Sequence, residues 1–280
     1  MKRALFLVAL LLAWPAGAAL AADRFIVLAS TTSTENSGLL ADLLPRFRAH
    51  SGISVRVVAV GTGGALRLGA RGDADVVLVH SRRAELDFVA AGHGVERREV
   101  MTNDFVIVGP VGDPARAAGA DVLRALRRIV GRPFVSRGDD SGTHKKELGL
   151  WRAAGLDPTG GATGAASAAG VWYLESGSGM GATLNLAAAK DAYALADRAT
   201  WLAFGNRRGL GLLVAGDKRL LNVYGVMLVN PARHPVKAAE GRAFMAWLMS
   251  EGQAAIGAFR IKGQQAFWPQ EAKTGADLDK

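Results

Sequence analysis

Short apolar runs alternate along the chain with stretches in which apolar residues recur every three or four positions. Strands are predicted by the short runs, at residues 25–28, 55–60, 75–80, 105–110, 134–136, 193–195 and 221–229. Helices are predicted by the periodic stretches, around residues 39–47, 65–70, 83–91, 121–130, 142–154, 177–189, 198–204, 235–249 and 253–258. This alternation predicts an α/β fold with mainly parallel sheets flanked by helices.

Four features refine this pattern. Ser37 is a plausible N-cap for the first helix, and Pro45 inside its apolar pattern should bend or shorten it. Residues 75–80 are nearly all apolar, which is typical of a strand buried on both faces. Residues 159–170 are rich in Gly, Ala and Thr and predict a loop or a weak helix start.

The three most unusual loops all follow predicted strands. They read Ser-Thr-Thr-Ser-Thr at residues 30–34, Gly-Thr-Gly-Gly at 61–64 and Ser-Arg-Gly-Asp-Asp-Ser-Gly-Thr-His at 136–144. Ligands of parallel sheets bind at the carboxyl ends of strands. A helix that begins in such a loop offers unpaired N–H donors and partial positive charge. Together with the cation Arg137, the loops predict a cleft that surrounds a small oxyanion.

Each loop also has a simpler interpretation. Hydroxyl residues at 30–34 could serve only as turn and capping groups. The glycines at 61–64 do not complete a dinucleotide fingerprint, because Leu66 follows, and no P-loop Lys-Ser/Thr is present. A further glycine-rich helix start at 177–181 could form a wall of the same cleft with Trp172, Tyr173 and Tyr193.

Ser141 also suggests an enzyme, because His144 lies three residues later. A secreted serine hydrolase that uses Ser141 and His144 is therefore the alternative from a different functional class. The surrounding sequence misses the Gly-x-Ser-x-Gly spacing by one residue. The other histidines, His50, His80, His93 and His234, have no metal-ligand spacing, so we predict neither a metal cation nor a cofactor.

Residues 1–22 have the features of a cleaved signal peptide. Lys2 and Arg3 precede an apolar run of about a dozen residues, and Ala-Leu-Ala at 19–21 fits a cleavage site. A retained N-terminal anchor is the alternative. We therefore expect a secreted, periplasmic protein. The chain contains no cysteine, which excludes disulfides, thiolate metal sites and lipoprotein processing.

The charge balance is basic, with a formal net charge of +9 that falls to +7 without Lys2 and Arg3. The Lys and Arg residues are scattered and have no interleaved aromatic residues, so nucleic acid is not the expected partner. About 258 residues remain after cleavage, which is enough for one large or two medium domains.

Six segments in order along the chain resemble the periplasmic tungstate-binding proteins of ABC importers, which are type II solute-binding proteins. The segments are LASTTSTENSGLL (28–40), VGTGGAL (60–66), NDFVIVGP (103–110), SRGDDSGTHKKE (136–147), WYLESGSGMGATL (172–184) and YALADRAT (193–200). The family pattern usually begins the first loop with threonine, and Ser30 keeps the hydroxyl there. Gly64 stands where the family commonly has a polar residue.

The resemblance implies two α/β lobes joined by two crossover strands, near residues 101–110 and 213–223. It places residues 23–104 and 220–280 in the first lobe and 105–219 in the second. The implied ligand-binding residues are Ser30, Thr31, Thr32, Ser33 and Thr62 from the first lobe, and Arg137, Ser141, Gly142 and Thr143 from the second. It also implies a monomeric, non-enzymatic protein that delivers its ligand to an ABC permease in the inner membrane.

Tungstate and molybdate carry no proton near neutral pH and can only accept hydrogen bonds, so their site should offer donors and exclude carboxylates. Phosphate keeps a proton and would gain from an acceptor. Asp139 and Asp140 decide between these cases: tungstate is favoured if both face away from the ligand or pair with Arg137. Molybdate, phosphate and sulfate remain the alternative ligands.

Overall fold

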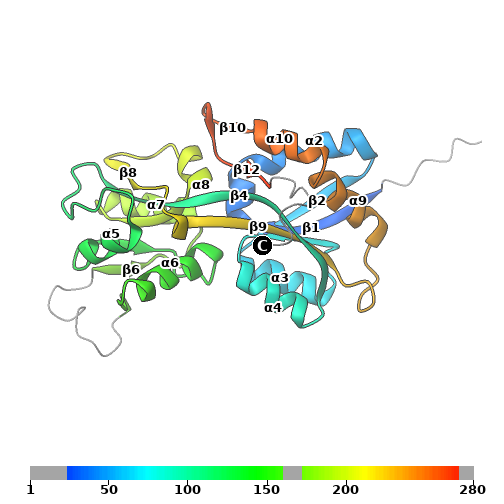
Figure 1. The fold of residues 1–280 in the computed structure, drawn as a ribbon, viewed down its shortest axis with the longest axis horizontal. Helices are drawn as coiled ribbons and strands as arrows, with labels where there is room; N and C mark the ends of the chain where they lie inside the picture. Colours follow the sequence, from blue (N-terminus) through cyan, green and yellow to red (C-terminus); the bar gives the residue numbers. More distant parts are fainter. Residues whose placement is uncertain (1–23, 160–171, 271–280) are drawn as a thin grey trace, which may run out of the picture.

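Two α/β lobes lie side by side in the computed structural model, which describes residues 24–159 and 172–270 (Figure 1). Two long strands, β4 (Gly94–Pro110) and β9 (Leu221–Val229), run between the lobes. The predicted two-lobed fold with two crossover strands is therefore confirmed. The predicted signal peptide and the predicted loop after Thr159 lie outside the described residues.

The first lobe is built on one part of an eight-stranded sheet whose main order is β12-β4-β9-β3-β1-β2. Strand β1 pairs in parallel with β2 and β3, whereas β3 with β9 and β4 with β9 are antiparallel pairs. Its strands are β1 (Phe25–Thr31), β2 (Ser54–Val60), β3 (Val76–Val79) and β12 (Trp268–Pro269), with the hairpin β10 (Arg260–Ile261) and β11 (Gln264–Gln265). Its helices are α1 (Thr32–Asn36), α2 (Leu39–Ser51), α3 (Thr62–Arg71), α4 (Arg82–Ala90), α9 (Ala238–Leu248) and α10 (Glu251–Ala258).

The second lobe continues from the far end of β4, which pairs antiparallel with β7 and β8. A separate parallel pair joins β5 to β6. Its strands are β5 (Phe134–Ser136), β6 (Tyr173–Glu175), β7 (Ala194–Asp197) and β8 (Leu210–Val214). Its helices are α5 (Val122–Ile129), α6 (Gly142–Ala153), α7 (Met180–Ala189), α8 (Arg198–Ala203) and the short 3-10 helix η1 (Lys218–Leu220).

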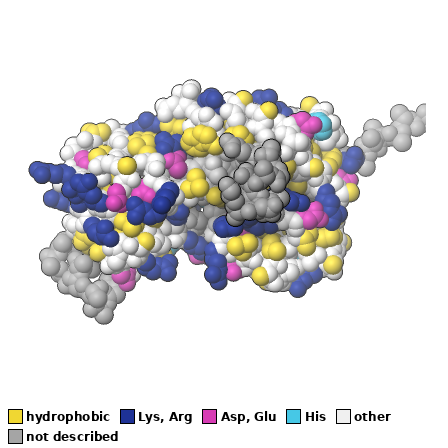
Figure 2. Space-filling model, in the orientation of Figure 1, with side chains coloured by type: hydrophobic (Ala, Val, Ile, Leu, Met, Phe, Trp, Pro, Cys, Tyr) yellow, Lys and Arg dark blue, Asp and Glu magenta, His cyan; other side chains and the backbone are white. Residues whose placement is uncertain are grey.

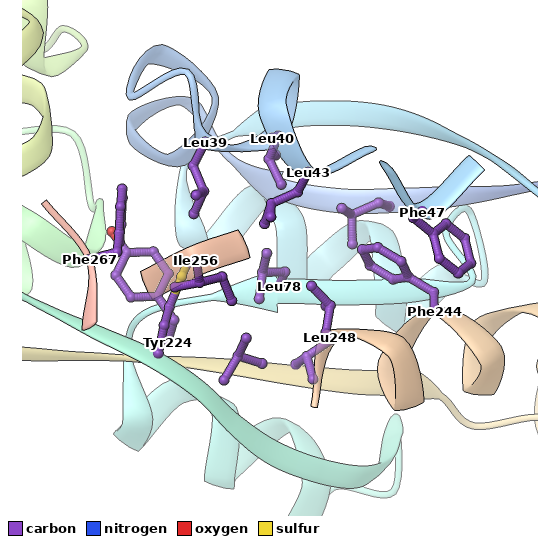
Figure 3. Packing of buried hydrophobic residues seen from close by; sticks show 14 of the residues in the cluster. Leu39, Leu40, Leu43, Phe47, Leu78, Tyr224, Phe244, Leu248, Ile256 and Phe267 are labelled. Atoms are coloured by element: carbon purple, nitrogen blue, oxygen red, sulfur yellow. The ribbon is translucent and has the colours of Figure 1, made fainter. Parts of the chain in front are cut away.

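Strand side chains alternate between two apolar cores in each lobe. In β3, Leu78 packs in the core beneath α2 and α9, and its neighbour Val77 packs against α3 and α4. In β4, Phe105 and Val106 divide between the two cores of the second lobe in the same way. Successive side chains of a strand point to opposite faces, so a sheet covered by helices on both sides needs continuous apolar runs. Figure 3 shows the first of these cores, where Leu78 lies among residues of α2, α9 and β9.

The second crossover strand differs from the prediction. Residues 213–223 do not form one strand, because β8 ends at Val214 and η1 intervenes before β9 begins at Leu221. Helix α2 continues through Pro45 and ends at Ser51, so the proline does not shorten it. The N-cap of α2 is Gly38 and not the predicted Ser37, although Ser37 Oγ accepts a hydrogen bond from the backbone N–H of Leu39 at 3.2 Å.

A buried ion pair fixes the start of α4 against β4. Glu85 is fully buried, and its carboxylate lies 2.7 Å from the Arg97 guanidinium, whose side chain is 13% exposed. The other carboxylate oxygen accepts the backbone N–H of Ser81, the residue before the helix, at 2.8 Å. Burial raises the pKa of Glu85 although Arg97 acts to lower it. The Arg97 cation therefore compensates the cost of burying the Glu85 carboxylate, and removal of Arg97 would leave that charge unpaired.

The surface fits the scattered basic composition. On the face shown in Figure 2, Lys and Arg side chains occur over both lobes and are interspersed with Asp and Glu. Among the described residues, no helix combines the length and the apolar character needed to span a bilayer.

Candidate functional site

A small, nearly closed cleft lies where loops of both lobes meet. The first lobe contributes the ends of β1, β2 and β3, and the second contributes the loop between β5 and α6. The cleft is bordered by Thr31, Thr32, Ser33, Val60, Gly61, Thr62, His80, Arg137, Ser141 and Gly142. Seven of the nine residues predicted from the sequence therefore converge on one cleft, from positions far apart in the chain.

The first loop presents hydroxyl groups held by hydrogen bonds among themselves. The Thr31 hydroxyl caps α1 by accepting the backbone N–H of Thr34 at 3.2 Å. Its oxygen lies 3.0 Å from Ser33 Oγ and 2.6 Å from Thr34 Oγ1. All three side chains are buried. The capping interpretation thus holds for Thr31, but the same group also borders the cleft.

Helices α3 and α6 both begin at the cleft and approach it from opposite lobes. Helix α3 starts at Thr62 after Gly61, and Thr62 Oγ1 is a buried atom without a hydrogen-bond partner among the described residues. Helix α6 starts at Gly142 after its N-cap Ser141. The first N–H groups of a helix have no partner inside it and carry partial positive charge. The two helix starts therefore make the cleft favourable for an anion.

Arg137 is the cation of the cleft. Its side chain is 4% exposed and forms an ion pair with Asp139 through Nη2. Its Nε is buried and has no hydrogen-bond partner in the described structure. A second carboxylate, Asp197, is held by Thr200 at the start of α8 and is close enough to Arg137 for the cation to lower its pKa, although burial raises it overall. Arg137 is thus held in place by Asp139 and keeps a donor available.

Neither aspartate of the loop borders the cleft. Asp139 accepts from Arg137 with one oxygen and from the Ser141 N–H, at 3.2 Å, with the other. Asp140 is exposed and pairs with Lys145 at 3.2 Å. Gly138 and Asp140, on either side of Asp139, adopt the left-handed backbone conformation, with φ of 59° and 56°. As far as the structure is described, the cleft border therefore contains donors and no carboxylate, the arrangement that favours an anion without a proton.

The Ser141 and His144 side chains are not arranged as a nucleophile and its base. Ser141 Oγ accepts the backbone N–H of His144 at 3.2 Å, as an N-cap does. His144 Nδ1 accepts the backbone N–H of Asp140, and its Nε2 lies 3.7 Å from Glu175. Among the described residues no hydrogen bond joins the Ser141 hydroxyl to the imidazole. The geometry gives no support to the hydrolase alternative.

Two predicted residues lie beside the cleft rather than on its border. The Ser30 hydroxyl donates to the backbone oxygen of Leu78 at 2.9 Å and ties β1 to β3. Thr143 is buried in the first turn of α6, and its hydroxyl has no partner in the described structure. The predicted aromatic wall is wrong, because Trp172 and Tyr193 pack in the core of the second lobe.

His80 borders the cleft and was not predicted to be a site residue. It follows β3, is buried, and stacks on the Tyr224 ring with 4.8 Å between ring centroids. Its Nδ1 lies 3.1 Å from Asn222 Oδ1, and its Nε2 lies 3.1 Å from Ser33 Oγ. The signal that could have found it is its place at the carboxyl end of a strand, as in the other site loops.

Burial and the nearby Arg137 cation lower the pKa of His80 to about 4, although the hydrogen bond from its ring to Asn222 acts in the opposite direction. The imidazole is therefore neutral at pH 7.

The described residues contain no group of three or more His, Cys, Asp or Glu side chains that could hold a metal ion.

Known proteins resemble the chain over most of its length. Residues 16–252 match the model of the PBP superfamily domain. The tungstate-binding protein TupA of Peptoclostridium acidaminophilum is 47% identical over 257 residues, which cover 89% of this chain and 86% of that protein.

Two solved structures are also similar. The structure of the tungstate-binding protein TupA from Desulfovibrio alaskensis G20 matches with a TM-score of 0.75 at 42% identity. The match covers 88% of this chain and 99% of the other chain. The structure described as the tungstate ABC transporter from Geobacter sulfurreducens matches with a TM-score of 0.74 at 45% identity. The match covers 84% of this chain and 98% of the other chain. The chain therefore belongs to the PBP superfamily and, within it, to the family of tungstate-binding proteins.

Proposed function

We propose that this protein captures tungstate in the cleft between its lobes and delivers it to an ABC importer. The observation that carries the proposal is the set of buried donors, including Thr62 Oγ1 and Arg137 Nε, at a cleft border without a carboxylate. The names of the similar proteins support the same ligand and the same transport system. The ligand contacts are proposed for Thr31, Thr32, Ser33, Thr62, Arg137, Ser141 and Gly142, with Ser30 and Thr143 in support.

Such a set of donors suits a ligand that can only accept hydrogen bonds. Each hydrogen bond to a charged oxygen contributes about 1.5–3 kcal/mol, so several of them outweigh the cost of association. The protein needs no cofactor and catalyses no reaction in this proposal. We further propose that it acts as a periplasmic monomer and that a permease in the inner membrane receives the ligand.

The lobes are proposed to close on the ligand by a hinge in the crossover strands. The proposed boundary between residues 104 and 105 agrees with the pairing of β4: its residues up to Asp104 pair with β9, and those from Phe105 pair with β7. The first lobe would then comprise residues 23–104 and 220–280, and the second 105–219.

Calorimetric titration of one preparation with tungstate, molybdate, phosphate and sulfate tests the proposed ligand. We expect tungstate and molybdate to bind at least about a hundredfold more tightly than phosphate at neutral pH, because no carboxylate among the described border residues can accept the phosphate proton. This ratio corresponds to about 2.7 kcal/mol of binding free energy. Phosphate binding as tight as tungstate binding, or no tungstate binding, would contradict the proposal.

A methyl group at Gly142 should weaken tungstate binding without unfolding the protein. A Cβ there would lie 3.1 Å from Thr62 Oγ1 and 3.2 Å from His80 Cε1, across the cleft in the other lobe. The Gly142→Ala variant should therefore hold the lobes slightly apart, and we expect its Kd for tungstate to rise about 10- to 100-fold, or about 1.4–2.7 kcal/mol.

Gly149→Ala is the matched control, because it lies in the same helix and a Cβ there meets no atom within 4 Å. This control should bind tungstate normally, and alanine should stabilise the helix by up to about 1 kcal/mol. Equal tungstate affinities of the two variants would show that the lobes do not close at Gly142.

A further inference from the structure

His80 links the cleft to both crossover strands through a chain of buried hydrogen bonds. Asn222 lies on β9 and donates through Nδ2 to Oδ1 of Asn103 on β4, at 2.7 Å. Its Oδ1 is then the atom that faces His80 Nδ1. An amide oxygen only accepts, so His80 Nδ1 carries a proton. The crossover strands thereby fix which ring nitrogen is protonated.

A neutral imidazole with a proton on Nδ1 has a bare Nε2. This nitrogen can only accept, and the group beside it is the Ser33 hydroxyl at 3.1 Å. A hydroxyl has a single proton, so the Ser33 proton points to His80 and cannot also serve a ligand in the cleft. Ser33 Oγ would then present lone pairs to an anion, which is unfavourable.

A second proton on His80 removes this conflict. The Nε2–H would donate to Ser33 Oγ, and the Ser33 hydroxyl could then donate to the ligand. We propose that His80 takes up one proton from solvent when an oxyanion dianion enters the cleft, and that this proton turns the Ser33 hydroxyl towards the ligand. The inference rests on the proposed function, and it makes His80 a positioning residue that acts through Ser33.

The charges around His80 fit this coupling. From the loop before α6 it faces Arg137, whose cation opposes a second proton. Asp139 and Asp197 lie near Arg137 and partly balance it. The other neighbours are uncharged: Asn222 and Tyr224 from β9, Phe105 from β4 and Gly142 from α6. A dianion beside Arg137 would reverse the local potential and favour the protonated ring.

The sign of the pH dependence follows from this coupling. The pKa of His80 is about 4 without ligand, and a dianion beside the ring should raise it. Between these two pKa values, tungstate affinity should fall as pH rises, by up to about tenfold per pH unit. The range from pH 7 to 8 is suitable for the measurement, because tungstate is a free dianion there.

Calorimetry with sodium tungstate at pH 7, in buffers with different ionisation enthalpies, measures the proton count directly. We expect the wild-type protein to take up close to one proton per tungstate. His80→Gln should still bind tungstate, because its amide N–H can donate to Ser33 Oγ, but it should take up no proton and show a flat pH profile. His50→Gln, at an exposed position of α2, is the matched control and should behave like the wild type.

Tight tungstate binding by the wild type with a buffer-independent enthalpy would overturn the inference and leave the proposed function intact. Proton uptake that persists in His80→Gln would also overturn it and would point to Glu147, whose pKa burial raises to about 7. Absence of tungstate binding would instead overturn the proposed function. Nitrogen-15 NMR of the wild-type histidines needs no variant: both His80 ring nitrogens should be protonated with tungstate, and only Nδ1 without it.

Discussion

The Arg137→Ala variant should lose about 3–5 kcal/mol of tungstate binding free energy, which raises Kd roughly a hundredfold to several thousandfold. Arg137 is buried at the cleft and is the only formal cation among the described residues that border it. A buried dianion without a countercharge is strongly disfavoured, and the guanidinium also provides hydrogen bonds in a fixed planar geometry. Calorimetric titration with tungstate at neutral pH measures the loss.

Part of this loss will come from Asp139, which is left without its ion-pair partner beside the anion. The double variant Arg137→Ala with Asp139→Asn should therefore recover some of the affinity. Arg46→Ala is the matched control, because Arg46 pairs with Asp42 on the exposed side of α2 and should not affect binding. Unchanged affinity of Arg137→Ala would remove Arg137 from the site.

The Arg97→Ala variant should lower the free energy of unfolding by about 3–5 kcal/mol at pH 7, because it leaves the buried Glu85 carboxylate without its cation. Adding Glu85→Gln should restore part of the stability, since a neutral amide costs less to bury. Arg83→Ala, in the helix α4 that also contains Glu85, removes an exposed ion pair with Asp87 and should change stability by less than about 0.5 kcal/mol. Denaturant unfolding measures all three variants.

The pH dependence identifies the cause of the Arg97 effect. The folded-state pKa of Glu85 is already raised by burial, and removal of Arg97 raises it further. When a carboxyl group has a higher pKa in the folded state than in the unfolded state, its contribution to the free energy of unfolding is complete below the unfolded-state pKa. This contribution is lost as the pH rises through the folded-state pKa. The stability deficit of Arg97→Ala should thus be larger at pH 8 than at pH 5. A deficit independent of pH would assign the effect to lost packing.

The sequence predicted the fold class and most of the cleft because both depend on local patterns. Apolar runs buried on two faces identify parallel-type strands such as β1 and β3, and such strands bring the loops at their carboxyl ends together. The loops that carry Thr31, Thr62 and Arg137 could therefore be expected to meet at one site, and the resemblance to tungstate-binding proteins identified the individual residues.

Other features depend on contacts between distant parts of the chain. His80 is a site residue only because Asn222 and Ser33 reach it from other strands, and no local spacing encodes that meeting. The pairing of Asp139 with Arg137 depends on the left-handed backbone of the loop. The hydroxyl of Ser30 is used by β3, a partner that neighbours in sequence cannot reveal.

The order of the elements has a consequence for biosynthesis. The core of the first lobe packs Leu28 and Leu78 against Phe244 and Phe267, so its final pieces are translated last. The second lobe draws most of its core from one continuous stretch and can condense earlier. Residues 24–104 can therefore complete their core only after nearly the whole polypeptide has been synthesised. Such late closure of long-range contacts slows folding and prolongs the interval in which a chaperone or translocase can engage the extended polypeptide.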